Sequence, residues 1–209
     1  MNNQLIVFLR KPVRGEVKTR LASGIGQDQA LSVYKWLISI TLDAAKKVNA
    51  EIHLFLDRTD KEFNVPDSFS IHVQDGSDLG ERMMNSFKSL SGNGEKNTII
   101  IGSDCPEMHE DILDEAYMKL SEKDLVVGPA VDGGFYLLGM KKAHTGLFDG
   151  IVWGGENVFD RLVSNARLLN LSFTVLGHRR DIDEASDFTL FKDQYEQYCL
   201  KEYNNVTQG

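Results

Sequence analysis

The chain has 209 residues, enough for one α/β domain with a buried core, and its 42% hydrophobic content excludes wholesale disorder. Its formal net charge of −8 argues against a nucleic-acid partner, and its two cysteines lack the spacing of a metal site or a secreted disulfide framework. The apolar run at residues 4–9 is too short for a signal peptide or a membrane span, so we expect a cytoplasmic protein that binds no membrane.

Apolar and alternating segments predict strands, and apolar residues at helical spacing predict helices between them. The predicted strands are residues 4–9, 51–56, 70–73, 98–101, 125–127, 134–140 and 172–176. The predicted helices are residues 27–48, 80–90, 110–120, 157–165 and 184–198. Within the first helix, Trp36 is expected near the face that turns away from the core. The alternation predicts an α/β fold of three layers, α/β/α, around an open, mostly parallel sheet. Residues 1–200 are predicted to form one domain, followed by a polar tail over 201–209.

The loop after the first predicted strand, residues 10–26, gathers cations in an otherwise acidic chain. Its basic residues are Arg10, Lys11, Arg14, Lys18 and Arg20, and its glycines are Gly15, Gly24 and Gly26. Backbone N–H donors beside point charges suit a di- or triphosphate. The loop has neither the G-x-x-x-x-G-K-[ST] pattern nor the third glycine of the dinucleotide fingerprint. The alternative is a solvated basic loop without a ligand.

The segment 99–108, IIIGSDCPEM, carries a candidate metal ligand at the end of a buried strand. Ligands of open α/β sheets bind outside the carboxyl ends of the strands, which is where Asp104 falls. A carboxylate there can hold a Mg²⁺ ion that bridges substrate phosphates. The alternative for Asp104 is an aspartate that caps a helix N-terminus or stabilises a turn. Cys105 is expected to be a small buried residue, because no histidine is placed to suggest a catalytic dyad.

Two later loops carry further acidic candidates. Asp132 precedes two glycines, and this pattern fits either a ligand contact or a turn aspartate. Asp181 and Asp183 alternate near the end of the last predicted strand, so they are expected to point to opposite faces. We expect Asp183 to be the one that shares a metal with Asp104. Its alternative role is to cap the last helix.

Two further segments carry weaker functional signals. The glycine-rich segment 74–83, with Gly80 and Arg82, can close over a base or ribose, and an ordinary loop is the alternative. Trp153, followed by two glycines, is either a lid or acceptor platform or a packed surface side chain.

Several of these segments, taken together and in order, resemble a known family. They are KPVRGEVKTRLA, LGERM, GSDCP, GPAVDGGFYLLGM, the Trp153–Gly154 pair and DIDEASD, and they extend from Lys11 to Asp187. The chain resembles the bacterial GT-A-like group filed as DUF2064 and often labelled glycosyltransferase. This group is similar to the phospholactate guanylyltransferases and the molybdenum-cofactor guanylyltransferases. The resemblance implies a nucleotide-diphospho-sugar transferase fold.

The resemblance also implies roles for individual residues. Lys11, Lys18 and Arg20 would hold the nucleotide phosphates, and Asp104 and Asp183 would share a catalytic Mg²⁺ or Mn²⁺. The predicted site is therefore Lys18, Asp104 and Asp132 for catalysis, Lys11, Gly15, Lys18, Arg20, Gly80 and Arg82 for the nucleotide, and Asp104 and Asp183 for the metal. The chain departs from the family at Glu184, where threonine is common, and in having one aspartate in GSDCP where many GT-A glycosyltransferases have D-x-D.

These features predict a metal-dependent transferase that uses a nucleotide-diphospho-sugar donor and a small-molecule acceptor. The alternatives are nucleotidyl transfer from a nucleoside triphosphate, which the lysine and the single aspartate favour, and a non-catalytic nucleotide sensor. A phosphatase of the HAD type would need D-x-D-x-T after the first strand, and this chain has no aspartate there. The sequence specifies neither the base, sugar and acceptor nor the oligomeric state.

Overall fold

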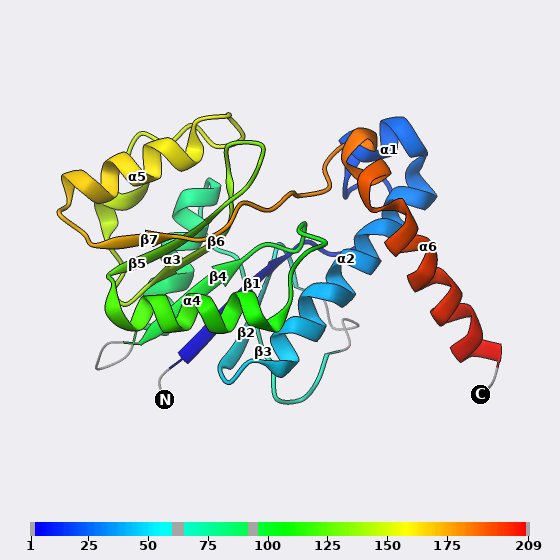
Figure 1. Cartoon of the computed structure of the whole chain (residues 1–209), viewed down its shortest axis with the longest axis horizontal. Coiled ribbons are helices and arrows are strands. Elements are labelled where there is room, and N and C mark those ends of the chain that lie inside the picture. The colour runs from blue at the N-terminus through cyan, green and yellow to red at the C-terminus, as the bar shows by residue number, and fades with distance from the viewer. Residues whose placement is uncertain (1–2, 60–64, 92–95, 208–209) are drawn as a thin grey trace.

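The computed structural model describes residues 3–59, 65–91 and 96–207. Within these ranges a seven-stranded sheet has the order β3-β2-β1-β4-β6-β5-β7 (Figure 1). Its strands are β1 (Asn3–Leu9), β2 (Glu51–Leu56), β3 (Ser70–Val73), β4 (Asn97–Ile101), β5 (Leu125–Pro129), β6 (Phe135–Met140) and β7 (Phe173–Val175). Only β6 runs against its neighbours, β4 and β5, and the other pairs are parallel. The predicted mostly parallel sheet is therefore confirmed.

Helices cover both faces of the sheet (Figure 1). They are α1 (Thr19–Ile25), α2 (Gln27–Lys47), α3 (Leu79–Leu90), α4 (Glu110–Glu122), α5 (Val158–Leu168) and α6 (Ala185–Thr207), with a short 3₁₀ helix at Thr145–Phe148. Successive side chains of a strand point to opposite faces. On β1, Leu5 and Val7 join the cluster under α2 and α4, whereas Ile6 joins the cluster under α3 and α5. The predicted three α/β/α layers are confirmed.

A third apolar cluster joins α1, α2 and α6 beside the sheet, where Figure 1 shows α6 projecting from the body. Trp36 is only 3% exposed, and its ring lies 5.6 Å from that of Tyr195 on α6. The prediction that Trp36 turns away from the core was wrong because α6 covers that face of α2. The packing of α1 on α6 also explains why residue 24 is a glycine, because a Cβ there would lie 2.6 Å from the Cβ of Ala185.

Two helix predictions need correction. Residues 19–25 were expected to belong to a loop and instead form α1, whose single fully buried residue, Leu21, gives no helical periodicity. The last helix was expected to end at residue 198, but α6 continues through Thr207 into the segment predicted as a polar tail. Residues 208–209 of that tail lie outside the described residues.

The order of the strands decides where a ligand can bind. From β1 the chain builds outward through β2 and β3, then returns to place β4 on the other side of β1. At such a switch point the loops after two neighbouring parallel strands diverge and leave a crevice at their carboxyl ends. The loops that carry Lys18 and Asp104 follow β1 and β4, so the topology brings them to the same crevice.

Helix α3 borders this crevice, and the N-cap residue at its start contributes to stability in a way that can be measured. The carboxylate of Asp78 accepts a hydrogen bond of 2.8 Å from the backbone N–H of Glu81. We expect Asp78→Ala to lower the free energy of unfolding by about 1 kcal/mol, measured by urea denaturation. Asp78→Asn keeps an acceptor at this position and should cost clearly less. Equal losses in the two variants would argue against the capping role.

Candidate active site

A cleft of about 1230 Å³ opens at the carboxyl ends of β1, β2 and β4. Segments far apart in the sequence border it, among them the loops after β1, β4 and β5, the start of α3, residues 153–156 and residues 181–183. The predicted site residues on its border are Lys18, Arg20, Arg82, Asp104, Asp132 and Asp183. This convergence is what the sequence predicted for the ends of neighbouring strands.

At the centre of the cleft, a buried lysine lies between two aspartates. Lys18 Nζ is 2.7 Å from Asp104 Oδ1 and 3.0 Å from Asp183 Oδ1, and the Lys18 side chain is only 6% exposed. The other oxygen of Asp183, Oδ2, accepts a hydrogen bond of 2.7 Å from Arg20 on the exposed side. Burying an ammonium is costly unless it is paired, and these two carboxylates provide the pairing.

The position of Lys18 depends on a strained backbone. Lys18 has φ +48° and ψ +45°, a left-handed conformation that costs a residue with a Cβ about 1 kcal/mol. It stands immediately before α1, and its carbonyl accepts the hydrogen bond of Ala22. Strain of this kind is concentrated at functional sites, so it supports a functional role for Lys18.

Backbone contacts fix the two aspartates. The N–H of Ile182 donates to the carbonyl of Asp104 at 3.0 Å, which ties the segment before α6 to the turn after β4. Asp187 accepts from the N–H groups of Asp183 and Glu184 at 3.2 and 3.0 Å. Asp187 therefore holds the start of α6, and the Asp183 side chain is directed at Lys18 and Arg20.

The charges of this cluster shift the pKa of its lysine. Burial by itself would lower the pKa of Lys18, but the charges and hydrogen bonds of Asp104 and Asp183 outweigh it, and the net shift is upward. Lys18 is therefore a fixed positive charge at physiological pH.

Asp181 also lies at the site, which the sequence did not predict. It was expected to point away from Asp183, but both residues border the cleft, because β7 ends at Val175 and residues 181–183 are not part of a strand. Asp181 Oδ1 is buried and has no hydrogen-bond partner. Burial, with the charge of Asp104 adding to it, raises the pKa of Asp181 to about 8.

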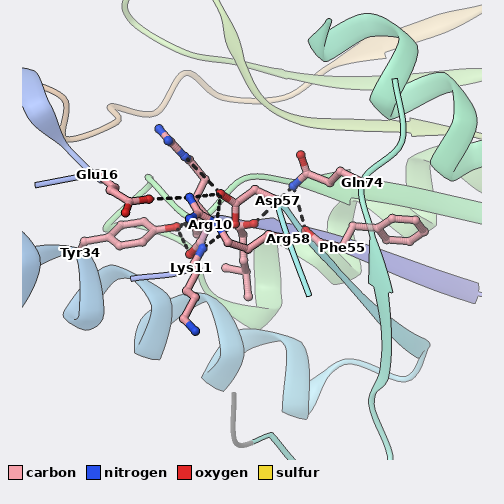
Figure 2. A network of polar contacts seen from close by, with 10 residues as sticks. Arg10, Lys11, Glu16, Tyr34, Phe55, Asp57, Arg58 and Gln74 are labelled. Carbon is pink, nitrogen blue, oxygen red and sulfur yellow. Dashed lines mark hydrogen bonds and ion pairs between the residues drawn. The ribbon is translucent and has the colours of Figure 1, made fainter. Parts of the chain in front are cut away.

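The beginning of the basic loop is held from two sides, as Figure 2 shows. The carboxylate of Asp57, after β2, accepts a hydrogen bond of 2.7 Å from the backbone N–H of Lys11. The hydroxyl of Tyr34 on α2 accepts one of 2.9 Å from the N–H of Arg10. Gln74 donates to the carbonyls of Leu9 and Phe55 and so joins the ends of β1 and β2. The helical periodicity of residues 27–48 indicates which side chains are buried but not the partner of a hydroxyl, so this role of Tyr34 could not be predicted from the sequence.

Some of the remaining predicted residues border the cleft and others do not. Neither Lys11 nor Gly15 is among the residues that border the cleft, although Lys11 anchors the loop through its backbone. Arg82 borders it and donates through Nε to the carbonyl of Gly76. Asp132 borders it as well, and its Oδ1 accepts from the N–H of Gly134 in the turn that was the alternative prediction.

Trp153 packs at one wall of the cleft. A Cβ on Gly80 would lie 2.6 Å from its ring, so Gly80 allows the start of α3 to approach Trp153. The ring also makes edge contacts with Phe135 and Phe148. Trp153 is thus a half-buried wall residue that joins α3 to the loops of the opposite side.

Cys105 does not have the properties of a nucleophile. It is 2% exposed, and burial raises the pKa of its thiol to about 12. The thiolate form that attacks an electrophile is therefore scarce at neutral pH.

The acidic residues fit a divalent cation that is completed by substrate. Asp104 Oδ1 and Asp183 Oδ1 lie 2.7 and 3.0 Å from the same nitrogen, so they are less than about 6 Å apart. In residues 3–59, 65–91 and 96–207, no three His, Cys, Asp or Glu side chains form a complete metal-binding group. Mg²⁺ is commonly bound by one or two carboxylates together with substrate phosphates and water, and this donor set matches the pair here.

Solved structures share this fold. A protein from Desulfovibrio desulfuricans G20, provisionally named a nucleotide-diphospho-sugar transferase, is similar over 91% of this chain and 86% of its own, with a TM-score of 0.85 and 28% identity. Rv0371C from Mycobacterium tuberculosis H37Rv, in complex with manganese, is similar over 90% of this chain and 96% of its own, with a TM-score of 0.57 and 15% identity. The 4-diphosphocytidyl-2C-methyl-D-erythritol synthase from Anaerococcus prevotii DSM 20548 is similar over 93% and 95%, with a TM-score of 0.58 and 13% identity.

The fold is that of the nucleotide-diphospho-sugar transferases, and the enzyme class is transferase, as the sequence predicted. The chain belongs to the family described as "Uncharacterized protein conserved in bacteria (DUF2064)", whose pattern matches residues 41–155. The matched range includes Asp104 and Asp132, whereas Lys18 and Asp183 lie outside it. No curated protein matches the chain. No helix in the described part of the chain is both long and apolar enough to cross a membrane.

The raised pKa of Asp181 predicts a pH-dependent stability. The native state keeps a proton on Asp181 that the unfolded chain releases above about pH 4, so this residue lowers the stability progressively as the pH rises from 4 towards 8. Asp181→Asn cannot ionise, and it should raise Tm at pH 8 more than at pH 4 in buffers free of divalent cations. Asp193→Asn, at an exposed position of α6, is the control. A Tm difference for Asp181→Asn that is the same at both pH values would contradict this account.

Proposed function

We propose that this protein is a metal-dependent transferase that takes a nucleotide-diphospho-sugar donor and passes the sugar to a small-molecule acceptor. The observation that carries the proposal is the buried Lys18 ammonium between Asp104 and Asp183, at the carboxyl ends of neighbouring strands. Similarity to the Desulfovibrio desulfuricans protein, over most of both chains, supports this donor class.

The balance of charge in the cleft supports a divalent cation. Six acidic side chains border the cleft, namely Asp57, Asp104, Asp132, Glu156, Asp181 and Asp183, against four basic ones, Arg10, Lys18, Arg20 and Arg82. The acids still outnumber the bases by one when Asp181 is protonated. A diphosphate would meet net repulsion there without additional positive charge. Mg²⁺ or Mn²⁺ held by Asp104 and Asp183 would supply that charge and stabilise the negative charge that develops on the phosphate oxygens. Rv0371C, which shares the fold, is a manganese complex.

The chain's own residues would divide the work along the cleft. Lys18 and Arg20 would bind the diphosphate oxygens, and Lys11 and Gly15 would shape the loop around them. Arg82, at the start of α3, would face the base and ribose, and Gly80 would let this part of α3 lie close to Trp153. Asp132 would lie on the acceptor side, beside the wall that Trp153 forms.

In the proposed reaction an acceptor oxygen attacks the anomeric carbon of the donor sugar. The bond from that carbon to the diphosphate oxygen breaks, and the nucleoside diphosphate leaves with the electron pair. The acceptor oxygen loses its proton as its new bond forms. The cations of the cleft would lie where this negative charge develops, and stabilisation of developing charge is the main way that such sites lower a barrier.

Nucleotidyl transfer is the second candidate, and the contact of Lys18 with the single aspartate of the β4 turn favours it. In that reaction an acceptor oxygen attacks the α-phosphate of a nucleoside triphosphate, and pyrophosphate leaves. Incubation of nucleotide sugars with inorganic pyrophosphate tests nucleotidyl transfer to a sugar phosphate, because the reverse reaction releases the sugar phosphate and forms a nucleoside triphosphate. Formation of a nucleoside triphosphate would identify a nucleotidyltransferase and overturn the glycosyl proposal.

A thermal-shift screen of nucleotide sugars and nucleoside triphosphates, with and without Mg²⁺ or Mn²⁺, tests the donor class. We expect nucleotide sugars with metal to raise Tm most, because stabilisation increases with ligand concentration over Kd. Lys18→Met should weaken donor binding roughly 10-fold or more, since a charge-assisted hydrogen bond contributes about 1.5–3 kcal/mol. Lys192→Met, on the exposed surface of α6, is the matched control. Donor binding that Lys18→Met leaves unchanged would refute the phosphate-binding role, and binding without any turnover would favour a sensor.

Metal binding without nucleotide gives a separate prediction. A cation that takes both Asp104 Oδ1 and Asp183 Oδ1 must take the place of the Lys18 ammonium. Lys18→Met should therefore bind Mn²⁺ alone more tightly than the unmodified protein, measured by electron paramagnetic resonance of free Mn²⁺. Arg20→Met removes the same charge from Asp183 on its exposed side and should raise the affinity less. A loss of Mn²⁺ affinity in Lys18→Met would argue against a metal at this pair.

A further inference from the structure

The hydroxyl of Tyr34 lies where two loops of the cleft meet. Tyr34 is only 3% exposed, and its oxygen contacts Arg10 N at 2.9 Å, Arg10 O at 3.1 Å and Ser103 Oγ at 3.3 Å. A phenolic hydroxyl has one proton to donate and two lone pairs. All three contacts form together if Tyr34 donates to Arg10 O and accepts from Arg10 N–H and from the Ser103 hydroxyl. The buried hydroxyl is then fully satisfied.

The two groups that Tyr34 joins belong to different parts of the candidate site. Arg10 begins the basic loop after β1, which leads to Lys18. Ser103 is the residue before Asp104 in the turn after β4. On the other side of the same loop, the next N–H along the chain, that of Lys11, is held by Asp57 (Figure 2). The start of the basic loop is therefore fixed at two consecutive residues, and the Tyr34 hydroxyl contacts both this start and the turn that carries Asp104.

This arrangement differs from ordinary packing of a core tyrosine. The ring of Tyr34 belongs to the apolar cluster between α2 and the sheet, and phenylalanine would fill the same volume. The hydroxyl makes its three hydrogen bonds with the two cleft loops, to the backbone of Arg10 and the side chain of Ser103. Its burial raises the pKa of Tyr34, so it remains a neutral donor and acceptor at physiological pH.

We propose that Tyr34 is a positioning residue, whose hydroxyl couples the phosphate-binding loop to the metal-binding turn at Asp104. This inference rests on the proposed function, because it assigns the two loops to the diphosphate and the cation of one donor complex. A shift of one loop against the other separates the charges that must act on the same diphosphate, and misplacements of about 1 Å can cost roughly 100-fold in rate. With the hydroxyl present, a nucleoside diphosphate and a divalent cation should each strengthen the binding of the other.

The chain contains a matched control for this hydroxyl. Tyr117 on α4 is also buried, and its hydroxyl donates to the carbonyl of Gln4 at 2.7 Å. Gln4 lies near the opposite end of β1 from Arg10, away from the cleft. Tyr117→Phe thus removes a buried tyrosine hydroxyl from the same core cluster without altering either cleft loop.

The experiment measures the binding of GDP, UDP, ADP and CDP by calorimetry, each with and without Mn²⁺, in the unmodified protein, Tyr34→Phe and Tyr117→Phe. The quantity of interest is the factor by which Mn²⁺ raises the affinity for a nucleoside diphosphate. We expect Tyr34→Phe to reduce this factor roughly 10-fold, the change that about 1.4 kcal/mol of lost coupling produces. Tyr117→Phe should keep the factor of the unmodified protein, even where both variants lower Tm.

Ser103→Ala provides a second route to the same contact. It removes the Ser103 hydroxyl and leaves the tyrosine in place, so it should reduce the coupling factor in the same direction, also where Tyr34→Phe fails to fold. A coupling factor that is equal in Tyr34→Phe and the unmodified protein, or that falls equally in Tyr117→Phe, would overturn the inference and leave the proposed function standing. Absence of Mn²⁺-assisted nucleotide binding in the unmodified protein would instead overturn the proposed function.

Discussion

The ammonium of Lys18, buried between two carboxylates, is the interaction that organises this molecule around its cleft. Its three members come from the loop after β1, the turn after β4 and the segment before α6, and each alone would be an unpaired charge in a partly buried place. An unpaired buried charge costs far more than the net contribution of the paired cluster. The three segments are therefore stable in their native positions only in combination. This stabilisation offsets the energetic cost of the left-handed backbone at Lys18.

The sheet makes this cluster possible because β4 lies directly beside β1. The two strands are parallel, so their carboxyl ends, and the loops that follow them, open at one edge. Strand β6 then pairs antiparallel with β4 and separates it from β5 and β7. The chain returns from β7 across the cleft, where the Ile182 N–H reaches the Asp104 carbonyl. Backbone hydrogen bonds of this segment, which include Arg179 N–H to the Pro129 carbonyl and Ile182 N–H to the Asp104 carbonyl, thus tie it to the loops of the site.

The sequence predicts an element correctly where its signal is local and periodic. It does not predict the burial or contacts of a residue that a distant segment of the chain covers. The strands β2 and β3 were predicted with their observed limits, since a run of alternating or apolar residues between turns defines a strand. Trp36 was misplaced because the helix that covers it, α6, lies near the other end of the chain. Asp104 was found from its position after a buried strand. The contact of Lys18 with it could not be predicted, since no pattern in the loop shows which of five cations becomes buried.

The acidic character of the cleft gives the last constraint. Anionic donors are best surrounded by cations, but here Lys18 is already neutralised by Asp104 and Asp183. Burial keeps Asp181 protonated at neutral pH, and this removes one negative charge from the same place. Even so, the acids that border the cleft outnumber its bases. Under the proposed function, such a site would have little affinity for a free diphosphate and would gain affinity when a divalent cation arrived with the donor. The acidic cleft would then select a metal–nucleotide complex over the free nucleotide, since only the complex brings the charge that the carboxylates need.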